Sequence, residues 1–488
     1  MSEPGPVVEL DLLHPAGRVG ARLAIGGAAR AIDHGESERP VDLVVVAPRH
    51  DEVSRAWLVA ALATAVDRMA RDAVAVVITP PRWRHGAERA IASAGLVLTD
   101  AIVTAPAWPD TKHFVPIATA PIADAGPRYL GLGPFPARLA RTAARLRVGR
   151  RLMRRRAIGC ALVAKRHTGS EPFAWLTALD GVAGARATVS GPTRADAPTA
   201  VVLRYPASGL VPDLAIKVAL DDAGRRRLAR ERTALAEVAP AAARAGVEVP
   251  SVKPGGTPWL LCTTIVSGAP AGSLLARRPS QLERVSRALV VWLTEWNRAT
   301  VSSAVASTDL LDRLVLEAVD RVTARDPSLV DYGRLVGDLA HRMLGQPVLL
   351  VAAHHDLTMA NVLDRGRTIG VLDWEEAEAT ALPATDLWYA LADGAARACR
   401  VSHADAVEAL VLGDVRLPNW FSGAAAELAS ALSLLPDEAS LAFHACWLHH
   451  AANEIARGER DGRFLAVVRR VASRRLLWPE SAPSTRST

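Results

Sequence analysis

The stretch HHDLTMANVL, residues 354–363, followed by IGVLDWEEA, residues 369–377, decides the fold prediction for this chain. Each piece joins a short apolar segment, typical of a strand, to a carboxylate. Asp356 and Asn361 are five residues apart, and Asp373 follows Asn361 by twelve. A tight loop and then a hairpin would bring the three side chains to one point. Carboxylate and amide oxygens suit Mg²⁺, and a carboxylate can orient an attacking hydroxyl, so the spacing predicts a centre for phosphoryl transfer.

The motif HxDxxxxN with a downstream DWE resembles the aminoglycoside phosphotransferase and choline kinase family, whose loop reads HGDxxxxN. The resemblance implies a kinase-like fold, ATP and Mg²⁺ as cofactors, and transfer of the γ-phosphoryl group to a hydroxyl of a small molecule. It further implies that Asp356 is the catalytic base and that Asn361 and Asp373 are the magnesium ligands. His354 would brace the loop. His355 stands where the family usually has glycine.

Lysine is rare in this chain, which draws attention to Lys217. Only four lysines occur among 58 basic residues, and Lys217 interrupts the apolar segment LAIKVAL. In a strand it would share a face with Ala215 and Ala219. The kinase resemblance implies that this lysine contacts the α- and β-phosphates and pairs with Glu231 of the next helix, in preference to Glu237. The alternative is an edge-strand lysine that discourages aggregation.

The segments expected to cover ATP carry weaker signals. SGPTRADAP, residues 190–198, lies between two predicted strands and holds a single glycine. Ser190 and the backbone at Gly191 are the candidate phosphate contacts. The strand WLLCTTIVSG, residues 259–268, is expected to lead into a hinge, where the backbone near Thr264 would contact adenine.

Two further segments of the predicted large lobe carry polar groups. Asp386, in PATDLWYAL, matches the family's second aspartate, which fixes the large lobe by hydrogen bonds. In CWLHHAANE, residues 446–454, His450 and Glu454 are one helical turn apart. They are interpreted either as acceptor contacts or as a surface pair. A metal site at His449 and His450 lacks a third ligand nearby in the sequence.

The first part of the chain has a different pattern. VDLVVVA, residues 41–47, and AVAVVIT, residues 73–79, read as buried strands, with helices predicted over 54–71 and 83–95. This alternation predicts a parallel sheet with crossover helices. The segment resembles the latter half of a Rossmann-like methyltransferase domain, but no GxGxxG-like cluster follows a first strand. A degenerate domain with a structural or docking role is therefore favoured over methyl transfer.

The overall prediction is an α+β two-lobed kinase-like fold, with a small β-rich lobe and a large helical lobe, preceded by a small α/β Rossmann-like domain. The expected parts are the Rossmann-like domain (1–125), a basic linker (126–160), the small lobe (161–268), the large lobe (269–480) and a disordered tail (481–488).

Charge and composition narrow the possible partners. The formal net charge is +7, but nine arginines fall within residues 138–156, and the chain from residue 346 onward is net acidic. No aromatic residues interleave with these arginines, so specific nucleic-acid binding is not expected. A solvated connecting helix is favoured there over weak contact with a membrane surface. Four cysteines without a CxxC pair, no apolar run long enough to span a membrane and no secretory leader predict a cytoplasmic location.

Three functions remain under consideration. An active small-molecule kinase is favoured, because Lys217, Asp356, Asn361 and Asp373 are all present. A catalytically weak pseudokinase that scaffolds a biosynthetic complex, or a bifunctional methyltransferase–kinase, are the alternatives. A protein kinase is disfavoured, because no APE-like element follows DWE. Sugars, aminoglycosides and amino alcohols are the candidate acceptors, and the sequence does not indicate an oligomeric state.

Overall fold

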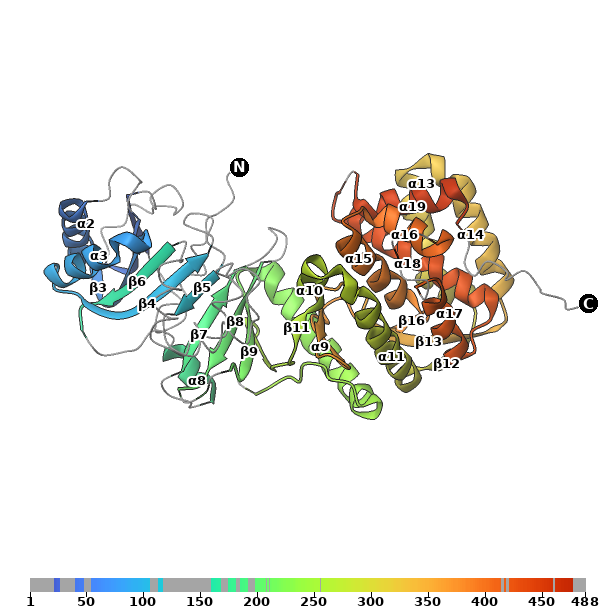
Figure 1. The fold of residues 1–488 in the computed structure, drawn as a ribbon, viewed down its shortest axis with the longest axis horizontal. Coiled ribbons are helices and arrows are strands. Elements are labelled where there is room, and N and C mark those ends of the chain that lie inside the picture. Colours follow the sequence, from blue (N-terminus) through green and yellow to red (C-terminus); the bar gives the residue numbers. More distant parts are fainter. Residues whose placement is uncertain are drawn as a thin grey trace, which may run out of the picture. The chain divides into compact units, whose positions relative to one another are not determined.

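The computed structural model describes two compact units (Figure 1). Unit 1 comprises Met1–Ala229 and Val252–Ile265, and unit 2 comprises Arg230–Ser251 and Val266–Thr488. The described residues are 22–26, 40–47, 54–105, 113–116, 159–167, 174–180, 185–191, 198–207, 209, 211–254, 256–413, 417, 421–459 and 461–476. The predicted arginine-rich segment and the predicted tail lie outside them.

Unit 1 is built on one ten-stranded sheet. In spatial order its strands are β1 (Arg22–Gly26), β2 (Val41–Ala47), β3 (Met69–Thr79), β6 (Gly159–Lys165), β4 (Val97–Ala105), β5 (His113–Pro116), β7 (Arg186–Ser190), β8 (Thr199–Tyr205), β9 (Leu214–Ala219) and β10 (Leu260–Thr264). The pairs β1–β2 and β2–β3 are parallel, and every later pair is antiparallel.

The two faces of the sheet bury alternate residues of the same strands. In β2, Leu43 and Val45 join a core with the strands of the β7–β10 region, whereas Val44 and Val46 pack with α2 (Arg55–Arg68) and α3 (Arg84–Ser93). A strand covered on both faces has to be apolar, which explains the run LVVVA that follows Asp42 in β2. Ser54 begins α2 as predicted, since its hydroxyl accepts a 3.1 Å hydrogen bond from the Trp57 amide.

The sheet differs from the all-parallel sheet that the alternation of strands and helices predicts. β6 lies between β3 and β4 and is antiparallel to both. Every residue of β6 (GCALVAK) is buried, and the apolar residues before Lys165 pack inside the sheet. The expected boundary at residue 160 therefore falls inside a strand that completes the N-terminal sheet. β5 then pairs with β7, so strands from both expected domains form one sheet.

The predicted strands of the small lobe are present as β7, β8, β9 and β10. β9 is paired on both sides, with Lys217 opposite Val201 of β8 and Leu261 of β10. The edge-strand interpretation of Lys217 is therefore wrong. Lys217 is half-buried on the face that it shares with Ala215 and Ala219, as the alternation predicts.

Helices dominate unit 2 (Figure 1). Helix α9 (Asp222–Ala245) begins in unit 1 and continues into unit 2. The later helices are α10 (Ala271–Arg277), α11 (Leu282–Thr300), α12 (Thr308–Leu311), α13 (Glu317–Arg325), α14 (Val330–Met343), α15 (Thr385–Cys399), α16 (His403–Leu412), α17 (Phe421–Leu432), α18 (Pro436–Ala456) and α19 (Arg463–Arg474). Among the described residues, no helix has the length and apolar character needed to cross a membrane.

Two small sheets of unit 2 position the motif segments. One contains β11 (Ala269–Pro270), β14 (Val362–Asp364) and β15 (Ile369–Val371). The other contains β12 (Ser302–Val305), β13 (Pro347–Ala353) and β16 (Glu378–Ala381). β13 leads into the loop at His354, and the hairpin β14–β15 leads to Asp373. The apolar ends of the two quoted stretches predicted β14 and β15, but nothing in them predicted β12 or β16.

Candidate active site

The loop after β13 has the geometry that its sequence predicts. The Thr358 amide donates to the Asp356 carbonyl over 2.7 Å, and the Asn361 amide donates to the Thr358 carbonyl over 2.9 Å. These two turns bring Asn361 back beside Asp356. The hairpin β14–β15 then returns the chain, and the Leu372 amide donates to the Asn361 carbonyl over 2.9 Å. The loop and the segment before Asp373 are therefore joined by backbone hydrogen bonds.

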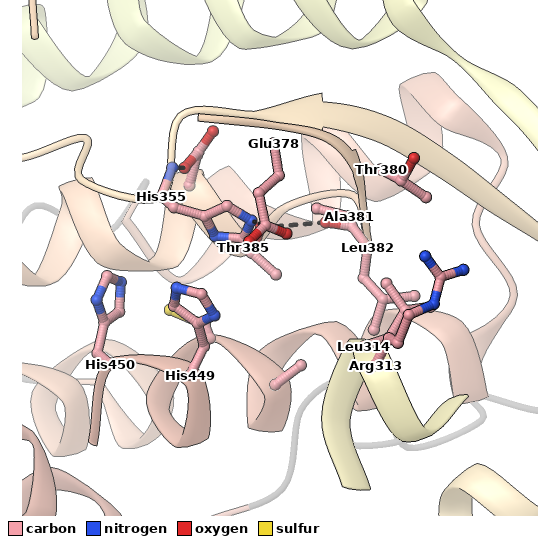
Figure 2. A pocket seen from close by; sticks show the side chains of 13 residues that line it. Arg313, Leu314, His355, Glu378, Thr380, Ala381, Leu382, Thr385, His449 and His450 are labelled. Carbon is pink, nitrogen blue, oxygen red and sulfur yellow. Dashed lines mark hydrogen bonds and ion pairs between the residues drawn. The ribbon is translucent and has the colours of Figure 1, made fainter. Parts of the chain in front are cut away.

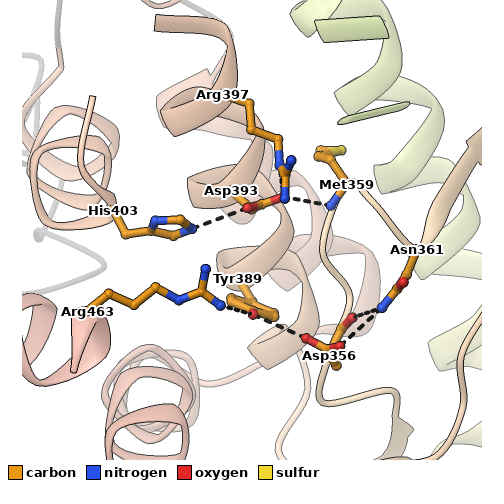
Figure 3. Close-up of polar contacts among 8 residues, drawn as sticks. All are labelled: Asp356, Met359, Asn361, Tyr389, Asp393, Arg397, His403 and Arg463. Carbon is orange, nitrogen blue, oxygen red and sulfur yellow. Dashed lines mark hydrogen bonds and ion pairs between the residues drawn. The ribbon is translucent and has the colours of Figure 1, made fainter. Parts of the chain in front are cut away.

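The carboxylate of Asp356 receives a hydrogen bond on each oxygen. The Asn361 Nδ2 donates to Oδ2 over 3.1 Å and also to the Asp356 carbonyl over 2.8 Å. The Tyr389 hydroxyl donates to Oδ1 over 3.2 Å (Figure 3). Burial raises the pKa of Asp356, and the negative charge of Asp373 adds to this, while His354 and the two donors oppose it. The negative charge of Asp373 therefore contributes to the raised pKa of Asp356.

Asn361 and Asp373 fit the role of ligands for a divalent cation. Because the Asn361 amide nitrogen faces Asp356, its amide oxygen points away and is available as a hard ligand (Figure 3). Two neighbouring carboxylates, Asp356 and Asp373, also favour a cation between or beside them. In the part of the chain that the structure describes, no group of three or more His, Cys, Asp or Glu side chains is placed to hold a metal. An amide ligand is consistent with that finding, because Asn361 supplies an oxygen from outside those residue types.

The two histidines of the loop have different environments. His354 is fully buried, its Nε2 lies 2.8 Å from the Leu372 carbonyl oxygen, and its ring packs against Trp374 at 4.8 Å between centroids. It therefore braces the loop, as the family resemblance implies. His355 has a φ of 59°, in the left-handed region that glycine adopts without strain. Histidine is one of the few other residue types enriched there, so the fold of the loop tolerates it.

Helix α15 presents one face to the loop. Asp386, Tyr389 and Asp393 are at positions i, i+3 and i+7, which lie on the same side of a helix. Asp386 accepts hydrogen bonds from the amides of His354 over 2.7 Å and His355 over 2.9 Å, which matches its expected structural role. Tyr389 and Asp393 were not among the predicted site residues. Their helical spacing from Asp386 is the sequence signal that could have identified them.

Asp393 fixes the middle of the loop. Its carboxylate is 1% exposed and accepts a 2.8 Å hydrogen bond from the Met359 amide. Arg397 Nε donates to the same oxygen over 2.7 Å, and His403 Nε2 lies 3.3 Å from the other (Figure 3). Burial would raise the pKa of Asp393, but hydrogen bonds from His403 and Arg397 outweigh it and the pKa is lowered. Asp393 is therefore held as a carboxylate under the loop.

A pocket opens beside His355, and its lining residues do not include Asp356, Asn361 or Asp373 (Figure 2). It encloses about 440 Å³ of empty space, open solvent at its mouth included. His355 Nε2 lies 3.5 Å from a carboxylate oxygen of Glu378 on β16, and its ring stacks on His449 at 4.3 Å. Burial opposes protonation of His355, but Glu378 and nearby acids outweigh it and raise the pKa. Burial and the charge of His355 lower the pKa of His449 to about 3.

His450 and Glu454, the predicted acceptor contacts on α18, have different environments. His450 lines the pocket and packs on the Tyr389 ring at 3.9 Å between centroids. Glu454 is buried and accepts a 2.8 Å hydrogen bond from the Phe464 amide at the start of α19. Neither side chain is exposed, so the surface-pair interpretation is wrong. The carboxylate of Glu454 holds α19 in place.

The remaining predicted site residues are distributed over both units. Ser190 ends β7, and its hydroxyl lies 3.1 Å from His113 Nδ1 of β5, while Gly191 follows it as a buried residue. Thr264 ends β10. Glu231 is 2% exposed, whereas Glu237 is exposed, which agrees with the preference for Glu231.

The structure places Lys217 in unit 1 and Glu231 in unit 2, together with Asp356, Asn361 and Asp373. The pairing of Lys217 with Glu231 therefore stays a prediction. The contact of Lys217 with the α- and β-phosphates stays a prediction as well.

The chain is similar to several solved structures of kinases. They include an ADP-bound aminoglycoside phosphotransferase APH(2'')-Ib, with 14% identity over 61% of this chain and 94% of that chain and a TM-score of 0.37. A choline/ethanolamine kinase family protein from Mesorhizobium loti has 18% identity over 60% and 90%, with a TM-score of 0.32. A glucosamine kinase has 14% identity over 62% and 82%, with a TM-score of 0.36. No protein-family model and no curated protein matches the sequence. These similarities are distant, and the residues of this chain carry the assignment below.

Proposed function

We propose that the chain is an ATP- and Mg²⁺-dependent phosphotransferase that moves the γ-phosphoryl group to a hydroxyl of a small molecule. One observation carries the proposal. The carboxylate of Asp356 is held by Asn361 Nδ2 over 3.1 Å, and the hairpin β14–β15 returns the segment before Asp373 to the same loop, where the Leu372 amide donates to the Asn361 carbonyl over 2.9 Å. A base, an amide ligand and a carboxylate ligand are the protein groups that kinases with this type of loop use where the phosphoryl group is transferred.

Each candidate site residue has a separate role in the proposed reaction. Asp356 orients the acceptor hydroxyl and accepts its proton as the hydroxyl oxygen bonds to the γ-phosphorus. The bond between the γ-phosphorus and the β–γ bridging oxygen breaks, and ADP leaves with that oxygen, without a covalent enzyme intermediate. Asn361 Oδ1 and Asp373 would hold Mg²⁺, which when bound supplies positive charge to the phosphate oxygens. Lys217 would contact the α- and β-phosphates, with Glu231 as its partner. Ser190, Gly191 and the backbone near Thr264 would cover the nucleotide.

The proposed setting is the cytoplasm, where ATP is available. All four cysteines are free thiols, and three of them are buried. Free thiols suit a reducing compartment.

A turnover assay tests the proposal. ATP consumption is measured with sugars, aminoglycosides and amino alcohols as acceptors, for wild type, Asp356→Ala and Asp338→Ala. Asp338 is an exposed carboxylate on α14 and serves as the matched control. Loss of the base should lower kcat by about 10²–10⁴-fold. Equal turnover by wild type and Asp356→Ala would contradict the assignment, and nucleotide binding without any turnover would favour a pseudokinase.

A further inference from the structure

We propose that Tyr389, supported by Arg463, is a positioning residue that fixes the Asp356 carboxylate towards the acceptor hydroxyl. The inference rests on the proposed function, because it assigns a task to the partner of the proposed base. It concerns a contact that the family resemblance did not imply.

The hydrogen bonds around Asp356 leave its carboxylate little rotational freedom. Asn361 holds Oδ2 from within the loop, and the Tyr389 hydroxyl holds Oδ1 from α15, over 3.1 and 3.2 Å. With only the Asn361 contact, the carboxylate could rotate about its χ2 torsion, which is broad for aspartate. The second donor, on a different element, defines the plane of the carboxylate. A base has to lie within hydrogen-bond reach of the proton that it accepts, so this plane affects the rate.

Tyr389 is itself held on several sides. Its ring packs on His450 at 3.9 Å and meets Phe464 edge-on at 5.4 Å between centroids. It lies on the buried helix α15, between Asp386 and Asp393, both of which hold the loop backbone. Burial raises the pKa of Tyr389 well above its usual value, and Asp356 adds to this, so the phenol keeps its proton and can donate.

Arg463 completes the chain of donors (Figure 3). Its guanidinium donates to the Tyr389 oxygen over 3.5 Å, so the phenol accepts from Arg463 while it donates to Asp356. The guanidinium also lies 3.8 Å from Glu454 and 4.5 Å from the Phe464 ring centroid. Arg463 is the first residue of α19, and the Glu454 carboxylate fixes that end of the helix through the Phe464 amide. The long Arg463–Tyr389 distance indicates a weaker contribution than that of Tyr389 itself.

Steady-state kinetics of Tyr389→Phe provide the first test. We expect kcat to fall about tenfold or more, with KM for ATP changed less than twofold, because misorientation of a reacting group affects the chemical step. Tyr332→Phe is the matched control: the Tyr332 hydroxyl lies 2.9 Å from His444 Nδ1 and does not contact Asp356. Arg463→Gln should lose less activity than Tyr389→Phe, and Arg463→Lys less than Arg463→Gln.

A double-mutant comparison separates positioning from general damage. If Tyr389 acts through Asp356, Tyr389→Phe should lower the residual rate of Asp356→Asn by less than twofold. A further loss as large as that seen in the wild-type background would overturn the proposal. An unchanged kcat in Tyr389→Phe would also overturn the proposal about Tyr389. The proposed function would still stand in that case if the wild-type activity depended on Asp356.

A spectroscopic readout remains informative even if wild type turns over no acceptor. The chain has only four asparagines, so selective ¹⁵N labelling of asparagine side chains gives a simple spectrum in which N361D identifies the Asn361 signal. Because Asn361 Nδ2 donates to Asp356, its resonance reports the carboxylate orientation. It should move in Tyr389→Phe and stay in Tyr332→Phe. Identical Asn361 signals in wild type and Tyr389→Phe would reject the proposal independently of catalysis.

Discussion

The described residues of the two units differ in which polar side chains they bury. In unit 1 the buried polar side chains are threonines together with Lys165 and Arg204, of which Arg204 forms a 2.8 Å ion pair with Asp213. In unit 2 the buried side chains include five carboxylates and three histidines, which are Glu231, Asp386, Asp393, Glu438, Glu454, His354, His444 and His450. A buried carboxylate is costly unless hydrogen bonds satisfy it. Asp386 and Asp393 are satisfied by the loop that carries Asp356.

This difference indicates what each unit's core does. The core of unit 1 stabilises a sheet, whereas two of the buried acids of unit 2, Asp386 and Asp393, hold the loop that carries Asp356. Substitutions in the two cores should therefore have different consequences, and the following predictions test that contrast from the largest expected effect to the smallest.

Leu43→Ala should give the largest change in stability. Leu43 is fully buried on β2, the second strand of the sheet in unit 1, and truncating such a leucine typically costs about 2–5 kcal/mol through lost burial and a cavity. Urea-dependent thiol labelling can follow the two units separately, because Cys262 is buried in unit 1 and Cys446 in unit 2. Leu43→Ala should expose Cys262 at lower urea, whereas the 37%-exposed Leu98 should tolerate alanine. Equal protection of Cys262 in Leu43→Ala and wild type would contradict the prediction.

Asp386→Ala should destabilise unit 2 and disorder the loop. It leaves the amides of His354 and His355 without their acceptor, at a cost of about 2–4 kcal/mol for two buried donors. The protection of Cys446 in the same urea assay gives the stability, and turnover reports the loop. Asp331→Ala, which removes an exposed carboxylate of α14, is the control. Unchanged turnover in Asp386→Ala would contradict the claim that the buried carboxylate of Asp386 holds the loop that carries Asp356.

Acid should destabilise unit 2 through His444. Burial lowers the pKa of His444 from 6.5 to about 4, so between these values the unfolded state binds a proton that the folded state does not. Stability is therefore lost as the pH falls from 6.5 to 4, by up to about 3 kcal/mol for a shift of this size. His444→Gln should flatten this dependence in urea denaturation measured from pH 4 to 8. The exposed His341 gives the control variant His341→Gln, which should keep the wild-type slope. A wild-type slope in His444→Gln would disprove the assignment.

Arg284→Ala should have the smallest effect. Arg284 makes two 2.8 Å contacts with Asp364 of β14, which tie the hairpin to α11. Its side chain is 39% exposed, so solvent screens the pair and the expected loss is about 0.5–1 kcal/mol. Raising the salt concentration should narrow the difference between wild type and Arg284→Ala. A loss of several kcal/mol would show that surface ion pairs in unit 2 matter as much as its buried acids.

Local patterns of the sequence predicted the strands and the loop of the candidate site. Asp356, Asn361 and the hairpin to Asp373 lie within eighteen residues, so turn geometry and strand pairing determine their proximity. The strands β2 and β9 and the N-cap Ser54 likewise depend on neighbouring residues. The structural role of Asp386 was implied by the family resemblance, and the hydrogen bonds that Asp386 accepts agree with that role.

Contacts between distant segments could not be predicted in this way. β6 lies between β3 and β4, although more than fifty residues separate it from β4 in the sequence. Tyr389 meets Asp356 only because α15 packs under the loop, and Arg463 arrives from α19. A helical face at i, i+3 and i+7 from Asp386 was visible in the sequence, but its direction depends on packing.

The most direct test of the central claim is binding of a divalent cation at Asn361 and Asp373. Mn²⁺ can replace Mg²⁺ as a paramagnetic probe, and electron paramagnetic resonance measures its binding in the presence of a non-hydrolysable ATP analogue. Asp373→Ala and Asn361→Ala should each weaken Mn²⁺ binding at least about tenfold, since even the outer-shell partners of metal ligands commonly have effects of that size. Asp338→Ala should bind as wild type does. Equal Mn²⁺ affinity in wild type and Asp373→Ala would contradict the account.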